Sequence, residues 1–129
     1  MYKLELIDLK DIIETEEHLH DRVIWLKDKI VEEKIWRIPL ILEKKTLAIM
    51  DGHHRFNVAK LIGLSKVPAI LLSYEQGHVA LTSWRDDIYI DKNIIFDFIS
   101  ERKLFPHKTT RHIITPNPEE LEIPLSFLY

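Results

Sequence analysis

Apolar and polar residues are arranged along this chain in patterns that predict both strands and helices. Residues 2–9 alternate in polarity, as in a half-buried strand, and Leu4, Leu6 and Leu9 would mark the buried side. From about residue 19 to residue 34, apolar residues recur at helical spacing among charges, which predicts an amphipathic helix. The apolar stripe of that helix consists of Val23, Trp25, Leu26, Ile30 and Val31.

The middle of the chain predicts a hairpin, a helix and a buried strand, in that order. Two apolar runs, 39–42 and 46–50, flank a polar turn at 43–45, as in a hairpin. A helical pattern starts at His53, and Gly63 stands where a helix often ends in glycine. The continuous apolar run 67–72 is typical of a strand buried on both faces.

The last third predicts one more strand, one more helix and an irregular tail. Residues 78–83 suit a strand and residues 93–102 suit a helix. Four prolines after residue 105 predict an ordered wrap with little regular structure. With no internal repeat and no linker-like tract in 129 residues, we predict a single domain, 1–129. Because strands and helices intermix, we expect an α+β (mixed α/β) fold, a small mixed sheet flanked by helices.

Composition excludes several classes of function. There is no cysteine, which removes disulfides, thiolate metal sites and cysteine catalysis. Lys and Arg total 18 against 21 Asp and Glu, so the net charge of −3 argues against a nucleic-acid partner. The N-terminal residues mix charges with apolar residues, unlike a signal peptide, and no apolar run is long enough to span a membrane. We therefore expect a cytoplasmic protein with no membrane partner; its oligomeric state stays open.

The segment Asp51-Gly52-His53-His54-Arg55 carries the strongest chemical signal. It places an acid, a glycine, two imidazoles and a guanidinium where a strand passes into a helix. A helix N-terminus presents free N–H groups and a positive dipole end, so these residues suit phosphate. The alternative is that Asp51 only caps the helix and the histidines are solvated. The density of cationic groups in one turn favours a binding site.

A second segment, Phe105-Pro106-His107-Lys108-Thr109-Thr110-Arg111-His112, suits the same ligand. Its two cations, two hydroxyls and imidazoles, in a loop bounded by proline, supply several donors to phosphate oxygens. A solvated basic loop is the alternative. Its pairing with the first segment favours a phosphate site.

Three acids and two tryptophans have less certain roles. Glu14, Glu16 and Glu17 precede the first long helix, where acids often serve the helix dipole, although one could act as a general base. Trp36 and Trp84 suit core or rim positions as well as a ligand platform. The residue types alone do not choose among these readings.

Taken together, these segments resemble the ParB/sulfiredoxin-like superfamily. The match comprises Asp51–Arg55, Ala59, Leu61, Gly63-Leu64, Val67-Pro68 and Tyr74. The sequence is most similar to the branch with the free L-serine kinases, which also carries a Lys-Thr-Thr-Arg-His segment and an Asn-Pro, here Lys108–His112 and Asn117-Pro118. The absence of cysteine excludes sulfiredoxin activity, and no segment is basic enough for a ParB-type DNA reader.

The resemblance implies a role for each motif. Gly52, His53, His54 and Arg55, with Lys108 to His112, would cradle nucleotide phosphates around Mg²⁺, with Asp51 as a catalytic residue and the metal ligand. A gapless count back from the Trp36–Pro39 region places the family's catalytic glutamate at Glu16, with Thr15 in place of a histidine and Glu17 as the fallback. Trp84 and His54 would lie near the substrate.

The expected function is therefore a nucleotide-dependent small-molecule kinase. The resemblance favours free L-serine as acceptor, O-phospho-L-serine as product, and ATP or ADP with Mg²⁺. The connection between the tryptophan segment and Lys108 is shorter than in some archaeal members, so another hydroxyl acceptor, such as a cyclitol, stays open. The alternative from a different class is a ParB-like regulator that senses nucleotide without turnover.

Overall fold

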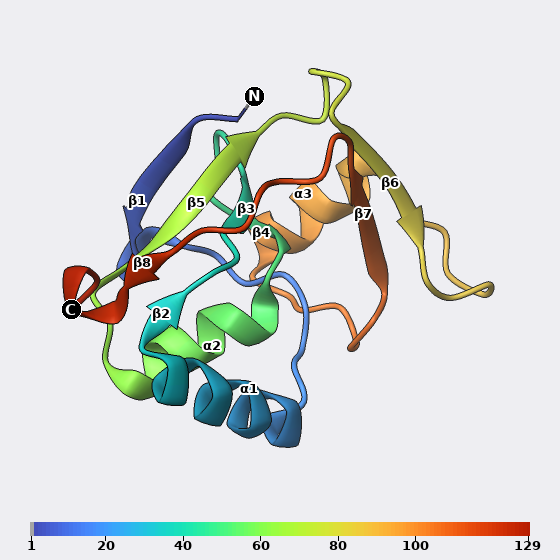
Figure 1. Ribbon diagram of the computed structural model, residues 1–129. Helices are drawn as coiled ribbons and strands as arrows, with labels where there is room; N and C mark the ends of the chain where they lie inside the picture. The colour runs from blue at the N-terminus through green and yellow to red at the C-terminus, as the bar shows by residue number, and fades with distance from the viewer. Residues whose placement is uncertain (1) are drawn as a thin grey trace.

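A mixed four-stranded sheet organises the computed structural model, which describes residues 2–129 (Figure 1). The strand order is β1-β5-β3-β4, and two-stranded pairings β2-β8 and β6-β7 lie beside the sheet. The strands are β1 (Leu4–Asp8), β2 (Ile35–Trp36), β3 (Leu40–Glu43), β4 (Ile49–Asp51), β5 (Lys66–Leu72), β6 (Val79–Ser83), β7 (Thr110–Ile114) and β8 (Ile123–Pro124). The helices are α1 (His20–Glu33), α2 (His53–Ile62) and α3 (Lys92–Glu101), with single turns of 3₁₀-helix at Leu9–Asp11 and Leu125–Phe127. The predicted α+β class with a mixed sheet is confirmed.

The register of the sheet follows from its most apolar strand. β5 runs parallel to β3 and antiparallel to β1, and β3 turns back antiparallel into β4 as the predicted hairpin. β5 has a partner on either side, and only Lys66 and Leu71 are less than fully buried, as its continuous apolar run predicts. The two faces of this sheet define the two main parts of the core.

Helices α1 and α2 pack on one face of the sheet, and the β6-β7 ribbon packs on the other. Val23 and Ile30 of α1 join Phe56 and Val58 of α2 in one apolar cluster with β3 and β5. On the opposite face, Ile41, Met50, Ile70 and Leu72 meet Val79 of β6 and Ile114 of β7. Helix α3 contributes Ile95 to a third cluster with Ile90 and Phe105.

Gly52 makes the sharp connection between β4 and α2. Its φ of 111° lies in the left-handed region, and a Cβ there would collide with Leu40 Cδ2. Gly63, with φ 81°, ends α2 as predicted, and its N–H bonds back to the helix. Asp51 is the last residue of β4, and α2 has no side-chain cap at its start. The N–H groups at the start of α2 therefore keep their capacity for an anion.

Two predictions about buried residues are wrong. Leu4 and Leu6 of β1 are 38% and 49% exposed, and the residues of this region that pack on the main core are Ile7 and Leu9. β1 is an edge strand, so the face that carries Leu4 and Leu6 lacks a full cover. On α1, Val23, Leu26 and Ile30 face the core, whereas Trp25 and Val31 are 63% and 44% exposed.

The prediction of an irregular tail from Pro106 onward is also wrong in part. Residues 110–114 form β7, which pairs with β6 from Ser83↔Thr110 to Val79↔Ile114, and Ile123–Pro124 pair with β2. Thr110, Arg111 and His112 therefore stand on a strand, and the loop holds only the residues before them. The prolines bound β7 without interrupting it. In the described part of the chain, no helix is long and apolar enough to cross a membrane.

Candidate active site

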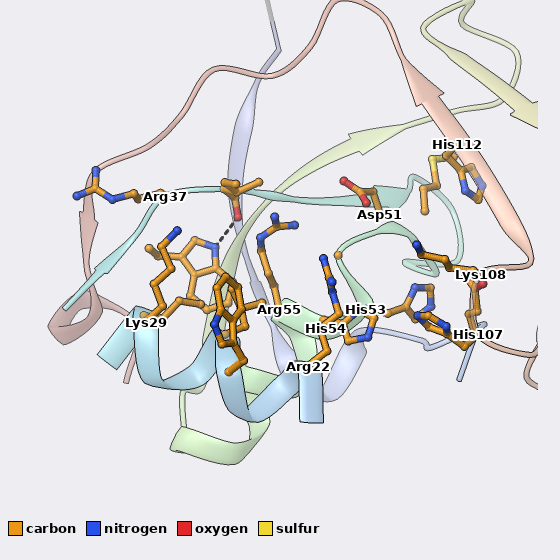
Figure 2. A pocket seen from close by; sticks show the side chains of 18 of the residues that line it. Arg22, Lys29, Arg37, Asp51, His53, His54, Arg55, His107, Lys108 and His112 are labelled. Atoms are coloured by element: carbon orange, nitrogen blue, oxygen red, sulfur yellow. Dashed lines mark hydrogen bonds between the residues drawn. The ribbon is translucent and has the colours of Figure 1, made fainter. Parts of the chain in front are cut away.

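A cavity of about 470 Å³ lies between α1, the start of α2 and the segment that leads into β7 (Figure 2). It brings together both sequence-predicted segments, which are more than fifty residues apart in the chain. The predicted site residues that line it are Glu16, Asp51, Gly52, His53, His54, Arg55, Trp84, Lys108, Thr110, Arg111 and His112. Thr109 is the one predicted site residue that does not line the cavity.

Glu16 is a nearly buried carboxylate, 8% exposed, at the wall of this cavity. The Thr109 backbone N–H donates to its Oε1, and the Thr110 hydroxyl donates to its Oε2 at 3.1 Å. Burial raises the pKa of Glu16, and these donors and the Arg85 charge only partly oppose that rise. The carboxylate is thus fixed in place and has a higher proton affinity than an exposed glutamate.

The neighbouring acids have different surroundings. Glu14 Oε1 accepts a hydrogen bond from Asn57 Nδ2 at 2.8 Å, and its Oε2 lies 3.8 Å from Lys60 Nζ, so Glu14 ties its segment to α2. Glu17 is exposed and lines the cavity, and its backbone N–H bonds to Phe105 O. Of the three acids predicted as possible bases, only Glu16 is both buried and at the cavity.

His53, the first residue of α2, is bonded to the segment that carries Glu16. Its Nε2 accepts the backbone N–H of Thr15 at 3.1 Å, and both residues are buried. Burial lowers the pKa of His53 to about 3, helped by the neighbouring histidines. The ring is therefore neutral, with its proton on Nδ1.

His54 and Arg55 follow on the first turn of α2. His54 Nε2 accepts the Leu19 backbone N–H at 3.3 Å, and its ring meets the His107 ring edge-on, with 5.5 Å between centroids. Burial and the Arg22 charge lower the pKa of His54 to about 4. Burial also lowers the pKa of Arg55, and the Asp51 carboxylate opposes this effect. In Figure 2, the Arg55 side chain rises from α2 between Asp51 and the α1 side chains.

The loop before β7 is anchored by its own polar groups. Thr109 is fully buried: its hydroxyl donates to Pro106 O at 2.6 Å and its N–H to Glu16. Arg85 Nη2 donates to His107 O at 2.8 Å. Lys108 is exposed, with a φ of 53° in the left-handed region, and its side chain points toward the cavity in Figure 2. Thr109 therefore holds the loop, whereas Lys108 is free to meet a ligand.

Arg111, His112 and Trp84 complete the far wall. The Arg111 guanidinium lies 4.3 Å above the Trp84 ring, a cation–π contact, and Trp84 is 53% exposed. His112 Nε2 lies 2.9 Å from the Tyr74 hydroxyl, and its Nδ1 is buried with no hydrogen-bond partner. Burial lowers the pKa of His112 to about 4. Trp36, by contrast, is 1% exposed and belongs to the core, with its Nε1–H donating to Ile38 O at 2.7 Å.

The cavity also has a wall that the motifs did not reveal. On α1, Arg22 and Lys29 lie at the cavity together with Trp25, Leu26 and Ile30. Arg22 and Lys29 are seven residues apart, two turns of one helix face, and this spacing is the signal that the sequence offered. Among the described residues, no carboxylate lies within ion-pair distance of Arg22, Lys29, Arg55, Lys108 or Arg111. The cavity is therefore rich in unpaired positive charge.

A protein-only metal site is absent from residues 2–129, since no three His, Asp or Glu side chains are grouped to hold an ion. Asp51 is an exposed carboxylate at the cavity, and no residue in the described part of the chain forms an ion pair with it. Mg²⁺ usually takes one or two carboxylates and completes its shell with water and substrate phosphates. The donor set at Asp51 fits that mode of binding.

Comparison with known proteins supports the predicted resemblance. ATP-dependent L-serine kinases from Staphylothermus marinus and Desulfurococcus mucosus are 34% identical over 83 residues and 29% identical over 103 residues, which are 61% and 77% of this chain. A ParB-like protein of Sulfolobus acidocaldarius is 38% identical over 56 residues, 43% of this chain. The matched parts make up only 28–40% of these relatives. No protein-family model matches the sequence.

Solved structures decide the fold. A free serine kinase in complex with AMP superposes with a TM-score of 0.89 at 14% identity, covering 99% of this chain and 94% of that one. The chain has the free serine kinase fold. A variant of a free serine kinase in complex with ADP gives a TM-score of 0.88 at 13% identity, covering 98% and 94%. The predicted resemblance is thus confirmed: the sequence is similar to a ParB-like protein and to L-serine kinases, and the fold is that of free serine kinases.

Proposed function

We propose that this protein is a phosphotransferase that moves a phosphoryl group from ATP or ADP to the hydroxyl of a small molecule, with free L-serine as the acceptor. One observation carries the proposal: Glu16, the one buried carboxylate among the described lining residues, stands at a cavity that also holds five cations without an ion pair, Arg22, Lys29, Arg55, Lys108 and Arg111. Phosphoryl transfer needs mainly positioning and charge stabilisation, together with a group that takes the hydroxyl proton. The names of the relatives support the serine acceptor.

The phosphate chain of the nucleotide lies at the start of α2. The free N–H groups of its first turn and the Arg55 side chain approach from one side, and Lys108 and Arg111 approach from the β7 side. When Arg111 contacts a phosphate, its guanidinium either leaves the Trp84 ring or stays in contact with it. In both cases the Trp84 ring lies beside the acceptor. Charge-assisted bonds from both sides hold the phosphates in line with the acceptor.

The nucleoside lies against α1. Trp25, Leu26 and Ile30 offer apolar surface at the other end of the cavity, where Lys29 and Arg37 also project in Figure 2. An aromatic base gains from such contacts, and the exposed Trp25 ring is free to pack on it. This arrangement separates the base from the reacting phosphate by the length of the cavity.

Asp51 holds Mg²⁺ together with the nucleotide phosphates and water. When bound there, the ion supplies charge neutralisation for the transferring group. The remaining positive charge comes from Arg55, Lys108 and Arg111, which the protein holds in place before the nucleotide arrives.

Glu16 accepts the proton of the acceptor. As the acceptor oxygen forms its bond to the phosphorus, the bond from phosphorus to the leaving nucleotide oxygen breaks, and the hydroxyl proton passes to a Glu16 oxygen. The Thr109 N–H, on Oε1, and the Thr110 hydroxyl, on Oε2, keep the carboxylate aimed during the step. Burial raises the pKa of Glu16, so its affinity for the proton is higher than that of an exposed glutamate.

The test is product identification by ³¹P NMR after incubation with ATP or ADP, Mg²⁺ and a panel of hydroxyl metabolites that includes L-serine. We expect O-phospho-L-serine, no turnover in excess chelator, and recovery with Mg²⁺ or Mn²⁺. Full turnover in excess EDTA would contradict the metal assignment. Tight nucleotide binding without turnover of any acceptor would replace the kinase by a nucleotide-sensing module.

A further inference from the structure

The segment that carries Glu16 is held by backbone hydrogen bonds on either side of Thr15. The Ile13 N–H donates to Leu47 O at 3.1 Å, and the Glu17 N–H donates to Phe105 O at 2.8 Å. The N–H between them, on Thr15, has no backbone acceptor and donates to His53 Nε2 instead. The Thr15 carbonyl accepts the Phe105 N–H at 2.8 Å, so the residue next to Glu16 is held by a backbone group at its carbonyl and by a side chain at its N–H.

The hydrogen bond between the Thr15 N–H and His53 Nε2 connects the two sides of the cavity. Glu16 is held on one side by Thr109 and Thr110, and the segment is held on the other side by the first residue of α2. Thr15 is 1% exposed and His53 is 8% exposed, so water does not replace the bond if the ring nitrogen is lost. A buried N–H without a partner is unfavourable, and the segment would shift to find one.

We propose that His53 is a positioning residue for Glu16, acting through the Thr15 amide, and that its Nε2 contacts no phosphate. The inference rests on the proposed kinase function, because it assigns to His53 the task of aiming the base. A displacement of about 1 Å at a catalytic group lowers the rate about 10²-fold. His53 thus differs in role from Arg55, although both stand in the same turn.

An imidazole that accepts an N–H at Nε2 is unprotonated there, so the hydrogen bond from Thr15 itself assigns the His53 proton to Nδ1. The Thr15 hydroxyl is secondary: it lies 3.3 Å from Ile49 O, to which it can donate, and 3.2 Å from Nε2. The backbone N–H is therefore the group that requires the ring.

Variants at two positions separate positioning from phosphate binding. In His53→Gln, the side-chain Oε1 reaches the place of Nε2 and accepts the Thr15 N–H; in His53→Asn, the side chain is too short. We expect His53→Asn to lower kcat about 10²-fold, His53→Gln to recover most of that loss, and both to keep the nucleotide Kd within about threefold of wild type. Thr15→Val removes the hydroxyl and keeps the N–H, so its kcat should stay near wild type.

Two measurements make the failure of this inference distinct from the failure of the kinase proposal. Loss of nucleotide affinity in both His53 variants would overturn the positioning role and make His53 a phosphate ligand. Equal kcat for His53→Gln and His53→Asn would also overturn it. In wild-type protein without any substrate, ¹⁵N NMR should show the His53 tautomer with the proton on Nδ1; a proton on Nε2 would overturn the inference, whether or not the protein turns over serine.

Discussion

Two buried glutamates in this molecule are held by similar groups and differ in almost everything else. Glu43, 4% exposed, accepts the Lys45 N–H, the Thr46 N–H and the Thr46 hydroxyl, all on Oε1. Glu16, 8% exposed, accepts one backbone N–H and one threonine hydroxyl on separate oxygens. The donors of Glu43 lie two and three residues ahead in the same turn, whereas those of Glu16 lie 93 and 94 residues away.

Glu43 completes a turn of the chain, whereas Glu16 is accessible to a ligand from the cavity. Glu43 closes the hairpin between β3 and β4, and its three donors belong to that hairpin. Glu16 lies at the cavity, and its donors come from the segment that also carries Lys108 and Arg111. Burial and hydrogen bonding alone therefore do not distinguish the two acids; the origin of their donors and the access to a cavity do.

The largest contrast is expected in turnover. Glu16→Gln removes the proposed proton acceptor and should lower kcat by roughly 10²–10⁴ while the nucleotide Kd stays near wild type. Glu43→Gln, Glu14→Gln and Glu17→Gln are the matched controls, and each should keep kcat. The measurement is kcat beside a nucleotide titration for the four variants. Collapse in Glu17→Gln with normal turnover in Glu16→Gln would move the base by one residue.

The second contrast is between cations at the cavity with Glu16 and a lysine in the Glu43 turn, and it is measured as nucleotide affinity. Arg55→Ala and Arg111→Ala each remove a charge-assisted contact at the cavity, worth about 1.5–3 kcal/mol, or about a 10- to 150-fold rise in the nucleotide Kd. Lys45→Ala, in the Glu43 turn, should leave the Kd unchanged. Isothermal titration with ATP or ADP measures all three. An unchanged Kd in both arginine variants would remove the phosphates from this end of the cavity.

The pH dependence of turnover sharpens the comparison further. Burial raises the pKa of Glu16, and only its ionised form accepts a proton, so kcat should fall as the pH drops through that raised pKa. The fall should approach tenfold per pH unit and begin above the ordinary pKa of glutamate, about 4.3. A kcat–pH profile on wild type and Glu16→Gln checks this. An acid limb at or below the ordinary pKa would contradict it.

The smallest effects should be on thermal stability. Substitution of Glu16 should change the Tm in the opposite direction to substitution of Glu43. A carboxyl whose folded pKa is raised contributes stability below its unfolded pKa, and this is lost as the pH rises through the folded value. At neutral pH the ionised Glu16 therefore destabilises the ligand-free protein, and Glu16→Gln should raise the Tm. Glu43→Ala leaves two turn N–H groups without their acceptor and should lower stability by about 1–2 kcal/mol, roughly 3–8 °C in Tm. Thermal unfolding at pH 7 decides whether the signs differ.

The sequence patterns predicted most of the fold because most of its elements depend on residues that are close together in the chain. The β3-β4 hairpin, the span of α1, and the glycine that ends α2 each depend on residues within one turn or one helix face. The errors arose where a distant segment decides the outcome. Leu4 and Leu6 are exposed because no element fully covers that edge of the sheet, and residues 110–114 form a strand because β6 is there to pair with them.

The same division holds for the site. Residue types were sufficient to choose Asp51–Arg55 and Lys108–His112, and the fold brings both to one cavity. They did not distinguish Thr109, whose groups hold the loop, from Thr110, which lines the cavity, nor His53, which faces Thr15, from its neighbours. These distinctions depend on which partner lies across a long-range contact. The catalytic role of each residue stays a prediction that the variants above test.

The long separation in sequence between Glu16 and its donors also affects the order in which the parts of the molecule can form during synthesis. Every strand of the four-stranded sheet, together with α1 and α2, lies within residues 4–72. As a chain leaves the ribosome from its N-terminus, these elements can associate while residues 109 and 110 are still unmade. Until residues 109 and 110 arrive, Glu16 lacks both of its hydrogen-bond donors. The Glu16 carboxylate is thus among the last groups of the molecule to be set in place, after the framework that supports it.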